Sequence, residues 1–238
     1  MSEPFSERTE EEARAIIARY PESRSALLPL LHLVQSVQGQ VSQEGIAFCA
    51  RLLALSTAEV DAVVTFYTMY KRRPCGEHLV SVCTNTLCAV LGGDAIYAKL
   101  REYLGEDGPA HGHEETFGEP GQPGSITLEH VECLAACDLA PVMQVDYEFF
   151  DKQSPDSATH LIDGLRSGNK PMPSRGAPLV GFRNAERQLA GFVELESDVD
   201  APSAAAETVR GAQLAADRGW TAPAMSDTPL PAVSDNKK

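Results

Sequence analysis

The stretch His78-Leu-Val-Ser-Val-Cys83-Thr-Asn-Thr-Leu-Cys88 begins with the pattern of a strand and ends in two cysteines. Its first six residues form a short, apolar run that contains two valines, and such a run predicts a buried β-strand. Residues 126–131 alternate in the manner of a second strand, and Cys133-Leu-Ala-Ala-Cys137 follows them closely. Loops at the ends of strands can aim side chains at a common point. We therefore expect four cysteines to lie together: Cys83, Cys88, Cys133 and Cys137.

Four thiolates in two pairs suit three kinds of site. Iron–sulfur clusters are held by four cysteines, and the small residues Thr84, Thr86, Ala135 and Ala136 leave room for a cluster and for backbone N–H groups that donate to sulfur. A structural zinc site also takes four thiolates, and its usual ligand spacing accepts both pairs. A redox dithiol usually has the spacing C-x-x-C, which this chain lacks. Spacing by itself leaves the cluster, the zinc site and the dithiol open.

Upstream of these pairs the sequence has the pattern of short helices. Thr9-x-x-Glu12 matches a capping box and predicts the start of a first helix. Ser42 can cap a later helix, and Ser56-x-x-Glu59 is a second capping box that leads into an apolar stripe. We expect a helical subdomain over residues 1–72.

Downstream, residues 73–185 mix both kinds of element. A helix is expected through Ile96 and Leu104, and residues 105–124, with six glycines and three prolines, are expected to form a loop. Residues 142–146 alternate like a strand, and Ser154-Pro155 is a good start for a final helix. The order of elements indicates an α/β or α+β domain.

The last part of the chain, residues 186–238, loses periodicity and is rich in Ala, Pro, Ser and Asp. We expect it to be a mostly disordered acidic tail. Trp220 is its one large aromatic side chain, and it is either an exposed aromatic without a role or a docking anchor for a partner.

Several other features receive a structural interpretation. Cys49 lies on an apolar helical face and is expected in the core, and Cys75 is treated as structural or incidental. His111-Gly-His113 could hold a metal, but a solvated loop is the better interpretation. Gly92-Gly93 lacks the surrounding pattern of a phosphate-binding loop, so no nucleotide or flavin site is expected.

The charge and the chain start limit the partners. A formal net charge of −14 repels phosphate backbones and anionic lipids, so nucleic acid and membrane surfaces are poor partners. No apolar run is long enough to span a bilayer. The start, MSEPFSERTEEEARA, is acidic and resembles neither a secretory signal nor a transit peptide. We therefore expect a reducing cytoplasm, where cysteines serve as ligands or free thiols.

The cysteine motifs resemble a known family. Cys-Thr-Asn-Thr-Leu-Cys at 83–88, Glu-Cys-Leu-Ala-Ala-Cys at 132–137, Ala-Pro-Val at 140–142 and Thr-Phe-Tyr-Thr-Met-Tyr at 65–70 are similar to the thioredoxin-like [2Fe–2S] subunit of respiratory complex I, an NADH:quinone oxidoreductase. The resemblance covers residues 8–170. The 105–124 stretch is longer than the family leads us to expect, and the tail after 186 has no expected counterpart.

This resemblance implies an α+β protein, with an N-terminal helical subdomain and a thioredoxin-like ferredoxin domain. It implies one [2Fe–2S] cluster on Cys83, Cys88, Cys133 and Cys137, and no catalytic residue of the chain's own. The implied function is to exchange one electron with the FMN of the partner subunit that oxidises NADH, next to a neighbouring iron–sulfur subunit. The implied location is the peripheral arm on the cytoplasmic face of a bacterial inner membrane. NAD-linked hydrogenases and formate dehydrogenases use similar subunits, so the sequence leaves these assemblies as alternatives, together with a zinc-stapled interaction module.

Overall fold

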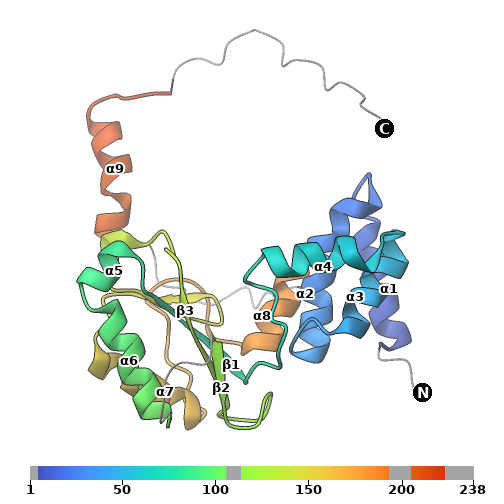
Figure 1. Ribbon diagram of the computed structural model, residues 1–238. Helices are drawn as coiled ribbons and strands as arrows, with labels where there is room; N and C mark the ends of the chain where they lie inside the picture. Colours follow the sequence, from blue (N-terminus) through green and yellow to red (C-terminus); the bar gives the residue numbers. More distant parts are fainter. Residues whose placement is uncertain (1–4, 106–113, 193–204, 223–238) are drawn as a thin grey trace. The chain divides into compact units, whose positions relative to one another are not determined.

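The computed structural model describes residues 5–105, 114–192 and 205–222 (Figure 1). The chain divides into two compact units, Met1–Ser203 and Ala204–Lys238. None of the helices in the described ranges has both the length and the apolar character needed to cross a membrane.

The first part of the larger unit is helical, as predicted. Ser42 accepts a hydrogen bond from the Gly45 N–H, and Ser56 forms the expected capping box with Glu59. Gly39 ends a helix with φ of 74°, in the left-handed region where glycine is favoured. The elements are α1 Glu7–Ile17, the 3-10 helix η1 Ser23–Ala26, α2 Leu27–Gln38, α3 Gln43–Leu53 and α4 Thr57–Phe66.

The start of α1 differs from the prediction. The helix begins at Glu7, because the Ser6 hydroxyl accepts a hydrogen bond from the Thr9 N–H. Glu12 does not reach back to cap this helix. Its carboxylate instead lies 2.6 Å from the Arg187 guanidinium, far along the chain. The capping box predicted at Thr9 is therefore wrong, because a long-range ion pair takes the glutamate that the local motif would use.

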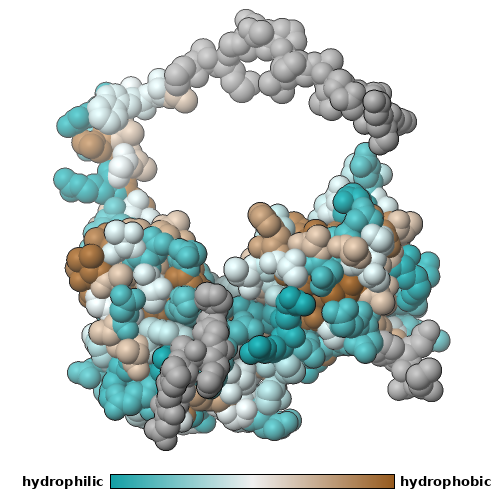
Figure 2. Space-filling view, in the orientation of Figure 1, coloured by the Kyte–Doolittle hydropathy of each residue, from teal (hydrophilic) through white to brown (hydrophobic). Residues whose placement is uncertain are grey.

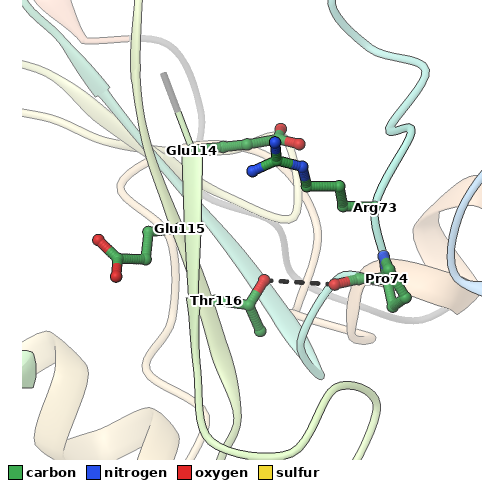
Figure 3. Close-up of a pocket in the computed structure, with 5 residues that line it drawn as sticks. All are labelled: Arg73, Pro74, Glu114, Glu115 and Thr116. Carbon is green, nitrogen blue, oxygen red and sulfur yellow. Dashed lines mark hydrogen bonds between the residues drawn. The ribbon is translucent and has the colours of Figure 1, made fainter. Parts of the chain in front are cut away.

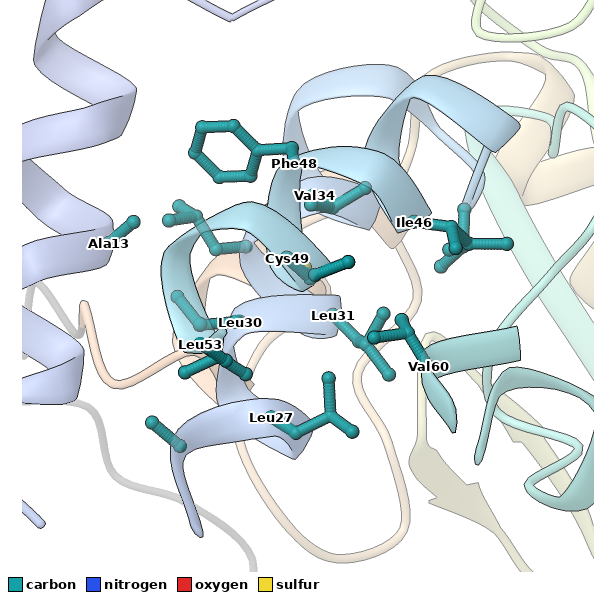
Figure 4. Close-up of a cluster of buried hydrophobic side chains, with 14 of the residues drawn as sticks. Ala13, Leu27, Leu30, Leu31, Val34, Ile46, Phe48, Cys49, Leu53 and Val60 are labelled. Carbon is teal, nitrogen blue, oxygen red and sulfur yellow. The ribbon is translucent and has the colours of Figure 1, made fainter. Parts of the chain in front are cut away.

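The core of this helical part is formed by buried side chains of α1, α2 and α3 (Figure 4). Leu30, Leu31 and Val34 of α2 are fully buried against Ile46 and Cys49 of α3. The prediction that Cys49 belongs to the core is confirmed. Burial raises the pKa of its thiol to about 12, so the group stays protonated and acts as a small apolar side chain.

The second part is built on a five-stranded sheet in the order β2-β3-β1-β4-β5. Strand β1 pairs in parallel with β3 and antiparallel with β4, and the two outer pairs are antiparallel. The parallel register sets Cys83 opposite Val131, so the loops that follow β1 and β3 leave the sheet at the same edge. The strands are β1 His78–Cys83, β2 Glu114–Phe117, β3 Ile126–Val131, β4 Met143–Val145 and β5 Glu148–Phe150.

Helices cover this sheet. Helix α5 (Thr86–Val90) contains the second cysteine of the first pair, and α6 (Gly93–Leu104) and α7 (Pro155–Arg166) pack beside each other (Figure 1). Ile96 and Leu100 of α6 share an apolar core with β1 and β3. The predicted cap of the last of these helices is confirmed, because Ser154 accepts a hydrogen bond from the Ser157 N–H.

The stretch predicted as a loop over residues 105–124 contains strand β2. Its four residues, Glu-Glu-Thr-Phe, include two acids and no aliphatic side chain, so they carry no strand pattern of their own. The strand exists because its backbone pairs with β3, with Phe117 opposite Ile126. Residues 106–113, including His111 and His113, lie outside the described residues.

Two helices extend past the boundary predicted at residue 185. Helix α8 (Phe182–Leu189) crosses that boundary, and α9 (Ala206–Asp217) belongs to the second unit. Glu186 of α8 is fully buried, with a carboxylate oxygen 2.6 Å from His32 Nδ1 of α2. The prediction of irregular structure is therefore wrong for residues 186–189 and 206–217. Residues 193–204 and 223–238 lie outside the described residues.

Candidate metal centre

The sheet brings two cysteine-bearing loops to one edge. Cys83 is the last residue of β1 and Cys88 lies in α5, and each is 1% exposed. Cys133 follows β3 and Cys137 begins the 3-10 helix η2 (Cys137–Leu139), and both are exposed. The Thr84 N–H donates to the Val131 carbonyl across 3.2 Å, which extends the β1–β3 pairing into the loops. One pair of thiols is thus buried at the sheet edge, and the other lies at the surface.

The exposed pair already has the spacing of metal ligands. The Cys133 and Cys137 Sγ atoms are 3.6 Å apart. Two thiolates on one tetrahedral metal, each bound at about 2.3 Å, lie about 3.8 Å apart. The Ala135 N–H donates to the Cys133 Sγ across 3.4 Å, and Ala135 adopts φ of 57°. This turn holds the first sulfur of the pair and supplies it with a hydrogen bond.

The two pairs influence each other electrostatically. Burial raises the pKa of Cys88 to about 11, and the neighbouring Cys83 and Cys137 thiols contribute to this rise. The pKa of Cys137 is raised first by its hydrogen bond with Cys133, then by some loss of hydration, and by the charges of Cys133 and Cys83. Four thiolates in this space would repel one another, so the site favours a bound cation that can offset their charge. A soft metal such as iron or zinc fits sulfur ligands of this kind.

The four cysteines approach as two pairs. Within residues 5–105, 114–192 and 205–222, no three His, Cys, Asp or Glu side chains converge closely enough to bind one metal ion. The prediction that the loops aim all four thiols at a common point stays a prediction. The prediction that all four act as ligands stays a prediction.

Two residues that the sequence interpretation passed over tie the loops together. The Asn85 side-chain amide donates a hydrogen bond of 2.6 Å to the Glu132 carboxylate. The Asn85 oxygen also accepts from the Thr86 N–H and so caps α5. Asn85 lies between the two cysteines of the first pair and Glu132 directly precedes the second pair, so their place in the motifs was the available signal.

The outer face of α5 is apolar. Leu87, Val90 and Leu91 are exposed, and apolar residues gather over α5 in Figure 2. They lie at i, i+3 and i+4, on one side of the helix, next to the buried Cys88. An exposed apolar group of this kind beside a candidate redox site is typical of a protein interface.

The cavity beside β2 and the thiol of Cys75 are not part of the candidate metal centre. A cavity of about 230 Å³ is lined by Arg73, Pro74, Glu114, Glu115 and Thr116, and in Figure 3 the Thr116 hydroxyl donates to the Pro74 carbonyl across 3.3 Å. It contains no cysteine. Cys75 is buried, and burial raises the pKa of its thiol to about 12.

Trp220 belongs to the smaller unit. Its side chain is 59% exposed, and the Arg218 guanidinium carbon lies 4.9 Å from the centre of its ring. Exposure agrees with both interpretations of this residue, so its role as a docking anchor stays a prediction.

The chain is similar to several known proteins. The profile of the thioredoxin-like [2Fe–2S] ferredoxin family matches residues 13–166, which include both cysteine pairs. The protein of Mycobacterium tuberculosis that is named as the E subunit of NADH-quinone oxidoreductase is 52% identical over 216 residues, 91% of this chain and 82% of that protein. A protein of Rhizobium meliloti, named as the E 2 subunit of NADH-quinone oxidoreductase, is 31% identical over 160 residues, 67% of this chain and 90% of that protein. A chain from an NAD⁺-reducing [NiFe]-hydrogenase crystal structure has a TM-score of 0.48 and 15% identity, covering 60% of this chain and 23% of that one.

The mycobacterial match also corrects an expectation about the tail. An alignment that covers 91% of the chain cannot fit within the first 185 residues, so it includes part of the region after residue 186. The tail therefore does have a counterpart in a relative.

Proposed function

The chain belongs to the thioredoxin-like [2Fe–2S] ferredoxin family, and from this premise we propose that it is the iron–sulfur electron-transfer subunit of an NADH-quinone oxidoreductase. The observation that carries the proposal is the 52% identity to the mycobacterial subunit over 91% of the chain, a range that extends well beyond the cysteine motifs. The family resemblance alone leaves other NAD-linked assemblies open, whereas similarity of this extent favours the respiratory one.

We assign the cluster ligands to Cys83, Cys88, Cys133 and Cys137. The arrangement in two pairs supports a binuclear cluster, because each iron of a [2Fe–2S] cluster takes two ligands from the protein. A structural zinc ion would need all four thiolates to converge on one point. The spacing of 3.6 Å between the Cys133 and Cys137 sulfurs suits two ligands of one iron. The buried Cys83 and Cys88 would then hold the other iron.

The residues around the site have defined tasks in this proposal. When bound, the cluster supplies a group that stores and passes on a single electron. Cys83 and Cys88 lie against the sheet and exclude water from one side of the site. The Ala135 N–H donates to the Cys133 sulfur, and hydrogen bonds to ligand sulfur help to set the reduction potential. Asn85 and Glu132 keep the two loops in register.

The partners follow from the same proposal. They are the FMN- and NADH-binding subunit and a neighbouring iron–sulfur subunit, in an arm on the cytoplasmic face of the membrane. The exposed apolar face of α5 supports a protein partner close to the cluster, because Leu87, Val90 and Leu91 remain uncovered beside Cys88. Burial of such a face against a partner would shield the site from solvent.

The test is the metal and sulfide content of the anaerobically purified chain, with EPR spectra before and after dithionite. We expect about two irons and two labile sulfides per chain, and a signal from one unpaired electron only after reduction. Zinc without labile sulfide would contradict the proposal and favour the zinc-stapled module. Dithiol turnover without any bound metal would favour a thiol–disulfide enzyme.

A further inference from the structure

The four candidate ligands divide sharply by exposure. Cys83 and Cys88 are each 1% exposed, whereas Cys133 and Cys137 lie at the surface. Cys49 and Cys75, the other two of the chain's six cysteines, are also buried. A small solute in water can therefore reach only the Cys133 and Cys137 thiols freely, and reactivity of thiols follows such access.

The two exposed thiols are also neighbours. Their Sγ atoms are 3.6 Å apart, and a disulfide needs about 2.05 Å. The residues between them form no regular helix or strand, and Ala135 makes a turn with φ of 57°. A movement of about 1.5 Å closes the gap, and side-chain rotation in such a loop can supply a movement of this size.

We propose that, in the chain without its cluster, Cys133 and Cys137 form a reversible disulfide by exchange with a low-molecular-weight disulfide. One protein thiolate attacks the small disulfide, forms a mixed disulfide and releases one small thiol. The second protein thiolate then attacks the mixed disulfide and releases a second small thiol. The protein pair loses two electrons and two protons in total, and the small disulfide gains them.

The disulfide between Cys133 and Cys137 would prevent cluster binding, and this part rests on the proposed function. The disulfide takes both thiolates from one iron site, so the oxidised chain cannot hold a cluster until a reductant opens the bond. The same bond protects the two exposed sulfurs, because a thiol in a disulfide does not proceed to sulfinic or sulfonic acid. A chain without its cluster would therefore still be able to bind one after the disulfide is reduced.

The sequence makes the test selective. Between Arg101 and Lys152 there is no lysine or arginine, so trypsin releases Glu102–Lys152, whose only cysteines are Cys133 and Cys137. Cys75, Cys83 and Cys88 fall together in a different tryptic peptide, which ends at Lys99. The full chain is stripped of metal, reduced, exposed to oxidised glutathione, then denatured, alkylated and digested.

We expect peptide Glu102–Lys152 to resist alkylation and to lack the mass of two hydrogen atoms, while the peptide that ends at Lys99 is fully alkylated. A phosphine reductant should restore both thiols. The Cys137→Ser variant should stop at a glutathione adduct on Cys133, and Cys75→Ala should behave as the wild type. Full alkylation of Glu102–Lys152, or a bond that includes Cys83 or Cys88, would overturn the proposal.

A parallel assay of iron uptake distinguishes failure of the disulfide proposal from failure of the proposed function. The reduced chain is supplied with ferrous iron and sulfide in parallel. Failure of the reduced chain to form a cluster would count against the proposed function and leave the disulfide result standing. A normal cluster on the reduced chain, with no disulfide after oxidation, would reject only the disulfide.

Discussion

Gly93 lies so close to Cys83 that a Cβ atom on Gly93 would stand 2.5 Å from the Cys83 carbonyl oxygen. The same atom would lie 3.0 Å from the carbonyl group of Cys88. Helix α6 therefore starts directly against the backbone of both buried candidate ligands. The absence of a side chain at this position lets the loop between these cysteines fold back onto the helix.

We expect Gly93→Ala to destabilise the protein by about 2 kcal/mol, because a methyl group must displace backbone atoms in a packed region. Thermal unfolding of the purified chain measures this as a fall in Tm of about 6 °C. Gly211→Ala in α9 is the matched control, because no atom lies within 4 Å of its added Cβ. An unchanged Tm in Gly93→Ala would show that the loop can move away without cost.

The ligand assignment predicts that Cys83→Ser removes the cluster, because a serine oxygen is a poor substitute for a soft thiolate on iron. We expect at least about tenfold less iron and sulfide per chain than in the wild type. Cys49→Ala, which changes a cysteine in the helical core, should keep the full content. Wild-type iron and sulfide in the Cys83 variant would sink the assignment.

The hydrogen bond between Asn85 and Glu132 predicts a kinetic role for a residue that is not a ligand. Glu132→Ala removes the acceptor, and a loss of about 1 kcal/mol corresponds to about fivefold faster cluster release in air. Bleaching of the visible spectrum over time measures this rate. Glu132→Gln keeps an acceptor oxygen and should release the cluster at nearly the wild-type rate. Equal rates in all three proteins would show that the link does not hold the loops.

Buried Glu186 joins the helical part to the sheet. One carboxylate oxygen lies 2.6 Å from His32 Nδ1, and the other accepts a hydrogen bond of 2.6 Å from the Tyr147 hydroxyl. Glu186→Ala leaves the buried His32 and the partly buried Tyr147 without this acceptor, and we expect a loss of about 3 kcal/mol in urea unfolding. Tyr147→Phe removes only one donor and should cost about 1 kcal/mol. A smaller effect in Glu186→Ala than in Tyr147→Phe would contradict this account.

The buried thiol of Cys49 predicts a pH dependence. Burial raises its pKa from 9.0 to about 12, so in this range the unfolded chain releases the proton first. Its contribution to stability is fully present below about pH 9 and is lost as the pH rises toward about 12. Between about pH 8 and about pH 10.5, the loss of unfolding free energy should be about 2 kcal/mol smaller in Cys49→Ala than in the wild type. Urea midpoints at the two pH values measure the difference, and parallel losses would contradict the assignment.

Much of the fold could be predicted from local patterns. The two strands that carry the cysteine loops, His78–Cys83 and Ile126–Val131, begin and end as expected, because short valine- or isoleucine-containing runs bury well in a sheet. The caps at Ser42, Ser56 and Ser154 were also predictable, since each side chain bonds a backbone N–H only a few residues away. These features depend on neighbours in sequence.

Features that depend on distant partners were not predictable. Glu114–Phe117 forms a strand only because β3 offers it an edge, and the capping box expected at Thr9 does not form because Glu12 pairs with Arg187. Helix α8 is held against α2 by the buried contact of Glu186 with His32, which lies 154 residues away in the sequence. In each case the stabilising contact joins residues that the sequence separates, so no local window contains it.

The chemistry of the candidate site can be predicted from the chain alone, because four cysteines in two spaced pairs already select a soft metal or a dithiol. The difference in exposure between the two pairs, in contrast, follows only from the folded structure. The sheet buries Cys83 and Cys88 and leaves Cys133 and Cys137 at the surface with their sulfur atoms 3.6 Å apart. That difference arises from the parallel pairing of β1 with β3 and from the packing of the start of α6 against the backbone of Cys83 and Cys88. The β1–β3 pairing joins two segments that lie far apart in the sequence, so only folding creates it.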